Sequence, residues 1–421
     1  MNAPLRLSPS VAALDMLRPG TTVFVPGVSG ESLAFFEELA RHPDRADGLT
    51  FVGVHFPGIN RCDYLSLHPN VRQRAYFMSQ ALREGLSTGR VDLLPLDYPG
   101  IVRDLERMRP PDVAVAQVSP PDEQGMCSLG VSQDFLPTIW HRATSRILHI
   151  NPRLPRTHGS FAVRASDCDI AFESDWAIPT LQDETPDAAS LRLAAMVAGL
   201  IEDGDTLQFG VGRLQAAVLG SLKNHRRLRV YSGMVSAPVV GLIDAGAIDG
   251  AGAIECGVAL GNEAFYARLD RDATFFFRPT AETHDIRRIA AIPNFCAINS
   301  ALEVDLFGQV NVDSLNGRLV AGVGGLPAFA AGAQLSPGGR SIIVLAASGD
   351  KGRVSRIVCA AETHPLIALP RHAADIVVTE YGVAQLRDRT VQERAQALLS
   401  IAAPEFRDEL GAQWRDVERR L

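Results

Sequence analysis

The stretch DGDTLQFGVGRLQAAVLGSL, residues 203–222, joins a short apolar run, a glycine-rich turn and a segment with helical spacing of apolar residues. An earlier stretch, PGTTVFVPGVSGESLAFFEEL (19–39), has the same three parts in the same order. Each is followed by a second short apolar run, LTFVGVH (49–55) in the first case and LRVYSGM (228–234) in the second. Two successive elements that match in order favour an internal duplication of the fold.

Apolar runs rich in β-branched residues continue this pattern through both halves of the chain. Segments with helical spacing, such as ESLAFFEELARH (31–42) and ASLRLAAMVAGLIEDG (189–204), separate them. The runs are TTVFVPG (21–27), LTFVGVHF (49–56), VDLLPLD (91–97), VAVAQVSP (113–120), RILHINP (146–152), TLQFG (206–210), RLRVYSG (227–233), TFFFRP (274–279), SIIVLA (341–346) and DIVVTEYG (375–382). Buried parallel strands that alternate with helices are typical of βαβ units. The sequence therefore predicts an α/β protein with two similar doubly wound domains, residues 1–187 and 188–421.

The composition excludes several classes of protein. Hydrophobic residues make up 46% and charged residues 21% of the 421 residues, as in soluble globular enzymes. The net charge of -7 arises from interspersed charges without a long basic run, so we expect no nucleic-acid partner. The six cysteines show no metal-ligand spacing, which favours a reduced, cytoplasmic protein without a bound metal. We expect no membrane association either, because no stretch reaches the roughly 20 apolar residues of a membrane span.

Five longer strings occur in a fixed order along the chain. They are QVSPPDEQGMCSLGVS (117–132), INPRLPRTHG (150–159), INSALEVDLFGQVN (298–311), GVGG (322–325) and VVTEYGVAQLR (377–387). The ordered set resembles the acetyl-CoA hydrolase/transferase family, which includes 4-hydroxybutyrate, succinyl and itaconate CoA-transferases. The resemblance covers nearly the whole chain.

This resemblance implies a CoA-transferase fold of two domains with the active-site cleft between them. It also implies an acyl-CoA substrate, a small carboxylate as acceptor, no permanently bound cofactor, a homodimer or other homo-oligomer, and a place in acetate metabolism. In the family a glutamate attacks the thioester and forms a glutamyl-CoA intermediate, while glycine-rich loops stabilise the oxyanion. The matching CoA-binding loop here is Gly322, Val323, Gly324 and Gly325, and the matching first turn of the second domain contains Gly210, Val211 and Gly212.

The chain departs from the family at the position of the covalent glutamate. Alignment of RVYSGMVSAP (229–238) places Gly233 at the glutamate, next to Met234, and Ala237 at a later acidic position. A shift of register does not supply a carboxylate, because residues 226–242 contain neither Asp nor Glu. Three other positions of the family pattern also differ: Leu326 and Ala328 stand where the family has Gln and Asp, and Gln215 stands where it usually has Pro. These changes predict a remodelled site.

Two side chains of the first domain are candidates to replace the missing acid. Glu31 lies in the turn GVSGES, the counterpart of the second domain's glycine-rich turn, and could act as a general base on water. The alternative is a Glu placed at a helix N-terminus, with Ser29 as a possible cap. His55 occupies the strand end that corresponds to Met234, and either faces the site or is a packed, hydrogen-bonded residue.

Other reactive side chains are weaker candidates. Glu303 and Asp305 alternate along an expected strand, where a supporting role is favoured over catalysis. Cys127 lies in a family string but is interpreted as a packed thiol. Ser232 flanks the lost position without a G-x-S-x-G motif.

Three functions remain compatible with the sequence. The first is an enzyme that acts on an acyl-CoA by hydrolysis or CoA transfer without the usual glutamyl-CoA. The second is a catalytically degenerate homologue that binds CoA. The third is an enzyme repurposed for another acyl-CoA reaction, in which the space left by Gly233 accommodates a bulkier acyl group.

Overall fold

The computed structural model describes residues 7–182, 185–315, 317–359 and 366–421, which form two compact units. Unit 1 consists of Met1–Gln182, Gly250–Thr283 and Val320–Gly322. Unit 2 consists of Asp183–Asp249, His284–Leu319 and Val323–Leu421. The domain boundary that the two sequence repeats predict, between residues 187 and 188, stays a prediction.

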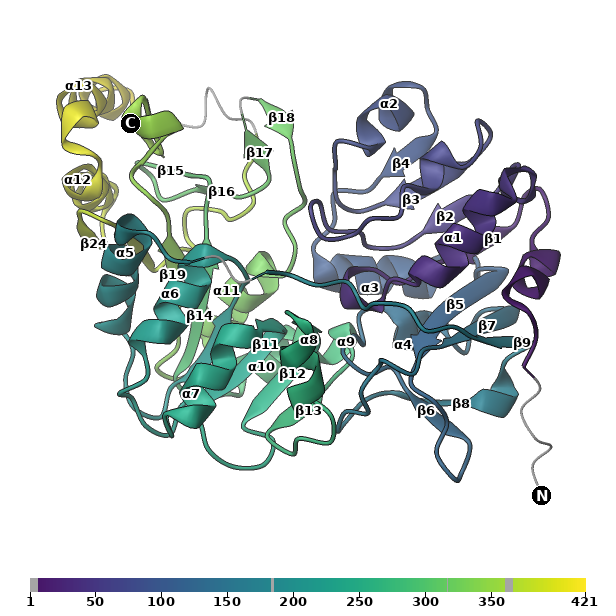
Figure 1. The fold of residues 1–421 in the computed structure, drawn as a ribbon. Helices are drawn as coiled ribbons and strands as arrows, with labels where there is room; N and C mark the ends of the chain where they lie inside the picture. Colours follow the sequence, from purple (N-terminus) through teal and green to yellow (C-terminus); the bar gives the residue numbers. More distant parts are fainter. Residues whose placement is uncertain (1–6, 183–184, 316, 360–365) are drawn as a thin grey trace. The chain divides into compact units, whose positions relative to one another are not determined.

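Unit 1 is built on a parallel sheet with the strand order β4-β3-β2-β1-β5-β7-β9 (Figure 1). Its strands are β1 (Thr22–Phe24), β2 (Thr50–Val52), β3 (Arg72–Ala75), β4 (Val91–Leu93), β5 (Val113–Val118), β6 (Met126–Ser128), β7 (Ser145–Ile150), β8 (Ala162–Arg164), β9 (Ile170–Glu173), β12 (Ile254–Leu260) and β13 (Phe275–Phe277). Its helices are α1 (Leu33–Arg41), α2 (Leu82–Ser87), α3 (Tyr98–Arg107), α4 (Leu136–Ile139), α8 (Glu263–Arg268) and α9 (Thr280–Thr283). All six residues of β5 are buried, as expected of a central parallel strand.

In unit 2, the strands β11, β10, β14, β19, β23 and β24 lie side by side in that order within a longer sheet. Its strands are β10 (Thr206–Phe209), β11 (Arg229–Ser236), β14 (Phe295–Ser300), β15 (Glu303–Asp305), β16 (Val310–Asn311), β17 (Ser314–Leu315), β18 (Arg318–Leu319), β19 (Arg340–Val344), β20 (Ser348–Gly349), β21 (Val354–Ser355), β22 (Ile357–Val358), β23 (Ile376–Thr379) and β24 (Gly382–Gln385). Its helices are α5 (Ala188–Ala198), α6 (Arg213–Ser221), α7 (Val240–Asp244), α10 (Ile286–Ala290), α11 (Leu326–Leu335), α12 (Val391–Ile401) and α13 (Arg407–Glu418). The run DIVVTEYG contributes β23 and then turns back into β24, which pairs with it antiparallel.

The duplicated parts of the sequence occupy equivalent places in the two sheets. The strand before each glycine-rich turn is central: β1 pairs with β2 and β5, and β10 pairs with β11 and β14. A helix follows each turn, α1 in unit 1 and α6 in unit 2. The α/β fold with two parallel-sheet domains is therefore confirmed.

Local sequence signals explain the helix ends. The hydroxyl of Ser32 accepts a hydrogen bond from the Phe35 N–H and caps α1, whereas the expected cap, Ser29, donates to the carbonyl of Ala259. Thr390 and Glu393 form a reciprocal capping box at the start of α12. Among the described residues, no helix combines the length and apolar character needed to cross a membrane.

Candidate functional site

Gly233 lies in β11 near the carboxyl edge of the sheet of unit 2. This strand adjoins β10, and the strand order reverses between β10 and its other neighbour, β14. In open α/β sheets such a reversal is where ligands bind. Gly233 and Met234 are half-buried, but Ser232 is buried and its hydroxyl donates to the carbonyls of Phe209 and Met234 at 3.0 and 2.8 Å. Ser232 therefore fixes the backbone of the strand end.

The space beside Gly233 is filled by His284. A β-carbon placed on Gly233 would lie 2.7 Å from Cε1 and 2.8 Å from Nε2 of this imidazole. The ring is 3% exposed and packs against Phe329 of α11, with 4.6 Å between the ring centroids. The expectation of open room for a bulkier acyl group is therefore wrong at this point. The sequence gives no local signal for His284, because only the fold brings it to a residue 51 positions earlier.

The glycine loop before α11 contacts the same imidazole. A β-carbon on Gly325 would lie 2.4 Å from Nε2 of His284, so only glycine allows this approach. Gly324 has a φ of 62°, which also favours glycine. Leu326 and Ala328 are both buried on α11, and Leu326 belongs to the apolar core. Both side chains therefore pack inside unit 2.

The first residue of the GVGG string packs within unit 1. A β-carbon on Gly322 would lie 2.8 Å from the carbonyl oxygen of Tyr76 and 3.2 Å from the ring of Phe77. Val323 is half-buried and packs against the apolar core of unit 2. Glycine is therefore required at residue 322 by close backbone packing.

Amide side chains gather at the ends of β10 and β14. Gln208 and Asn299 exchange two amide hydrogen bonds, of 3.3 and 2.9 Å. In the first turn of α6, Gln215 donates through Nε2 to the hydroxyl of Ser300 at 3.2 Å, while its Oε1 is buried without a hydrogen-bond partner. A buried acceptor of this kind is costly unless a ligand or water satisfies it, so this edge is suited to a polar ligand.

The turn Gly210, Val211 and Gly212 leads from β10 into α6 and leaves its backbone accessible. Gly212 has a φ of 111° and is the N-cap of α6. A β-carbon on Gly212 would meet no atom within 4 Å, and one on Gly210 would meet only Gln215 Cγ at 4.0 Å. The turn therefore leaves open space beside its backbone, into which a ligand could fit.

In unit 1, Glu31 holds a loop in place. Its side chain is fully buried, and its two carboxylate oxygens accept hydrogen bonds from the backbone N–H groups of Arg61 and Cys62 at 3.0 and 3.1 Å. It precedes the cap residue Ser32, so it lies just outside α1. These contacts give Glu31 a structural role in fixing residues 61 and 62.

His55 lines a cavity of about 280 Å³ in unit 1, together with Arg61, Gln73 and Gln80. Its Nδ1 lies 3.3 Å from Gln73 Nε2, and its Nε2 is buried without a hydrogen-bond partner. Burial lowers the pKa of His55 to about 4. The imidazole is therefore neutral at neutral pH, and its low basicity makes it a weak general base.

The remaining candidate groups have structural surroundings. Burial raises the pKa of Cys127 to about 12, and burial together with the negative charge of Glu31 raises the pKa of Cys62 further, so neither thiol ionises readily. Asp305 accepts from the Phe307 and Gln309 backbones and from the Gln309 side chain. Among the described residues, no group of three or more His, Cys, Asp or Glu side chains could hold a metal ion.

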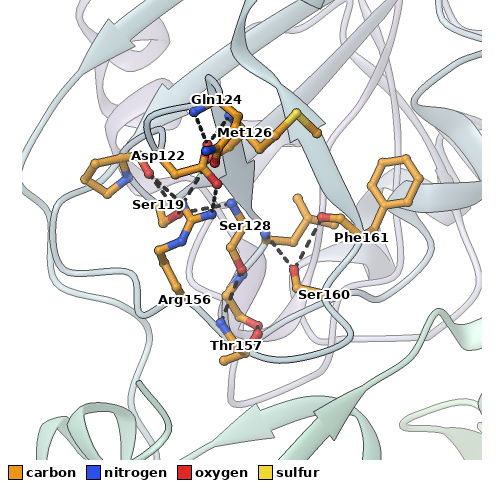
Figure 2. A network of polar contacts seen from close by, with 12 residues as sticks. Ser119, Asp122, Gln124, Met126, Ser128, Arg156, Thr157, Ser160 and Phe161 are labelled. Carbon is orange, nitrogen blue, oxygen red and sulfur yellow. Dashed lines mark hydrogen bonds and ion pairs between the residues drawn. The ribbon is translucent and has the colours of Figure 1, made fainter. Parts of the chain in front are cut away.

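Two of the strings that carry the resemblance meet in one polar network (Figure 2). Arg156 forms an ion pair with Asp122 at 2.8 Å and donates to the carbonyls of Pro120 and Met126. The N–H of Met126 in turn donates to Asp122 at 2.8 Å. This donation, with the charge of Arg156, lowers the pKa of Asp122. These strings therefore build the scaffold of unit 1.

Comparison with known proteins agrees with this fold. Residues 6–178 match the acetyl-CoA hydrolase/transferase N-terminal domain, and residues 261–414 match the C-terminal domain of the same name. The 4-hydroxybutyrate coenzyme A transferase of Clostridium kluyveri is 34% identical over 398 residues, which are 90% of each chain. The two-unit α/β architecture is thus that of the CoA-transferases. The chain belongs to the acetyl-CoA hydrolase/transferase family, whose members act on CoA thioesters.

Solved structures show the same architecture over nearly the whole chain. RipA from Yersinia pestis is 26% identical with a TM-score of 0.88, covering 98% of this chain and 97% of its own. The 4-hydroxybutyrate CoA-transferase from Porphyromonas gingivalis is 28% identical with a TM-score of 0.80, covering 99% and 98%.

Proposed function

We propose that the chain acts on an acyl-CoA thioester without forming a glutamyl-CoA intermediate, and that hydrolysis is its main reaction. The observation that supports this is the contact between Gly233 and His284, since the imidazole fills the space where a side chain at residue 233 would begin. A transferase that follows the usual family mechanism needs a carboxylate in the protein. This carboxylate carries CoA as a thioester after the donor acid has left and before the acceptor acid reacts. With Gly233 at that position, water becomes the simplest acceptor.

Substrate binding is assigned to the features described above. The backbone of residues 210–212 and of the 322–325 loop is proposed to stabilise the oxyanion and bind the CoA end of the substrate. Gln215 offers its buried, unpartnered Oε1 to a donor of the ligand. The names of the relatives, which include an acetyl-CoA hydrolase of Neurospora crassa, support both hydrolysis and transfer as chemistry for this scaffold. We also propose that the protein is a homo-oligomer.

A degenerate CoA-binding homologue is the alternative. The burial of Leu326 and Ala328, where the family pattern has polar residues, favours it. The two proposals differ in turnover, and CoA binding is common to both.

The test is to incubate the full chain with acetyl-CoA, propionyl-CoA or succinyl-CoA, with and without acetate or succinate. We expect release of free CoA thiol without an acceptor, and no CoA adduct in the intact mass of the protein. A new acyl-CoA that appears only with an acceptor, together with a CoA adduct, would show that transfer through a covalent intermediate persists. Calorimetric binding of CoA without any turnover would establish the degenerate homologue.

A further inference from the structure

His284 lies at a junction of unit 2 that places it beside the proposed reaction site. It follows α9 and precedes α10, and its ring reaches β11 and the start of α11. Phe329 packs against the ring, and Phe329 itself belongs to the apolar cluster with Tyr231, Ile289 and Phe295. The imidazole is therefore held by a rigid part of the core.

One edge of the ring faces two glycines. Nε2 lies 2.8 Å from a β-carbon placed on Gly233 and 2.4 Å from one placed on Gly325, whereas real β-carbons essentially never approach other atoms within 3.0 Å. Both glycines are half-buried, so this edge of the ring lies next to backbone that is partly open to solvent. Glycine at residues 233 and 325 therefore lets the imidazole approach the backbone of two separate elements.

We propose that His284 is a catalytic residue and acts as the general base of thioester hydrolysis. This inference rests on the proposed function above, and it names the group that replaces the missing carboxylate. Nitrogen Nε2 is the atom in question, because it is the ring nitrogen that faces Gly233 and Gly325. General bases of this type contribute roughly 10²–10⁴-fold to a rate.

The chemical step balances with water as the only co-substrate. Nε2 of unprotonated His284 accepts a proton from water while the water oxygen forms a bond to the thioester carbonyl carbon. The carbon–sulfur bond of the resulting tetrahedral intermediate then breaks, and the imidazolium gives its proton to the sulfur, so that CoA leaves as a thiol. The new carboxylic acid ionises and releases one proton to the solvent.

The test is the rate of CoA thiol release by the full chain carrying His284→Ala or His284→Asn, with acetyl-CoA, propionyl-CoA and succinyl-CoA as probes. We expect kcat to fall about 10²-fold or more with little change in KM, and imidazole in the buffer to restore part of the rate of His284→Ala. His225→Asn is the matched control, since His225 is a half-buried histidine of unit 2 that bonds the carbonyl of Ile201. This control should retain the wild-type kcat.

Gly233→Ala provides an independent test if the His284 variants fold poorly. Its β-carbon must displace the ring, and a misplacement of about 1 Å is expected to lower kcat by about 10²-fold. Wild-type rates in folded His284 or Gly233 variants would overturn the role of His284 and leave the hydrolase proposal intact. A wild-type chain that binds CoA and hydrolyses none of the probes would overturn both.

Discussion

At Gly233 the ring of His284 occupies the space in which a side chain would begin. A glutamate introduced there would start from a β-carbon 2.7 Å from the ring of His284, and that ring is confined by Phe329 and by Gly325. Overpacking of this kind costs about 1–3 kcal/mol and moves the neighbouring groups. A larger side chain at residue 233 therefore requires a smaller one at residue 284.

We predict that Gly233→Glu alone gains no CoA transfer and loses hydrolysis, because it adds a carboxylate while displacing the proposed base. The double variant Gly233→Glu with His284→Ala makes room for the carboxylate, and we expect it to transfer CoA from acetyl-CoA to succinate. Chromatography of the acyl-CoA products measures this, with His284→Ala as the matched control. Equal transfer by the single and double variants would contradict the steric argument.

Asp134 is a buried carboxyl in unit 1 whose ionisation opposes folding. It is 2% exposed; its Oδ2 accepts a long hydrogen bond of 3.4 Å from the Gly27 N–H, and the backbone of Phe135 also donates to the carboxylate. Burial raises its pKa to about 7, against an ordinary value of 3.8. Between these two values the folded state keeps a proton that the unfolded chain has released, so folding stability from this group falls as pH rises from about 4 to about 7.

We predict that Asp134→Asn removes this loss of stability. Asn tolerates the positive φ of 41° at this residue, and its amide oxygen can still accept from Gly27. The free energy of unfolding of the variant relative to wild type should rise across that pH range, by up to something on the order of 4 kcal/mol. Denaturant titrations at pH 4.5 and pH 8 measure it, and exposed Asp44→Asn is the control. A constant difference between variant and wild type at both pH values would show that Asp134 stays ionised throughout.

At the scale of single elements, the sequence predicts several strands from their uninterrupted apolar runs, but β12 and β14, which are largely buried, are not among them. The runs at 113–120 and 341–346 coincide with β5 and β19 because both strands are buried on two faces of a parallel sheet. It misses β3, Arg72–Ala75, because its exposed and half-buried positions carry arginine side chains and hide the apolar signal. The order of elements is therefore easier to predict than the full set of strands.

The candidate site is harder to predict than the elements that carry it. The glycine turns can be predicted because glycine leaves a local signature, and the role proposed for Gly233 rests on one aligned position. His284 has no such signature in AETHD (281–285), since its contacts with residues 233 and 325 exist only after β11 and α11 are in place. Ser29 was expected to cap α1 from its place in the turn, but the chain continues to Ser32 before the helix begins.

At the scale of the whole molecule, the segment 250–283 is integral to unit 1 although it lies within the second half of the chain. The hydroxyl of Ser29 donates to the carbonyl of Ala259 at 2.8 Å, and the Ala259 N–H donates to the carbonyl of Val131 at 2.8 Å. The hydroxyl of Tyr266 donates to the carbonyl of Pro179 at 2.6 Å. These bonds link the segment to three separate parts of the first 182 residues.

We predict that residues 1–187 expressed alone do not fold cooperatively. Without residues 250–283, the groups that hydrogen-bond to this segment lose their partners, and each lost hydrogen bond lowers the folding stability by about 1 kcal/mol. The apolar surface beneath the segment is also exposed to water. A domain is stable by only about 5–15 kcal/mol, so losses of this size remove much of the margin. Circular dichroism during heating is expected to show a broad, non-cooperative change for 1–187 and a sigmoidal transition for the full chain. A chain in which a flexible linker joins residue 182 to residues 250–283 should regain the sigmoidal transition. A sharp transition in 1–187 alone would mean that the first repeat folds without this segment.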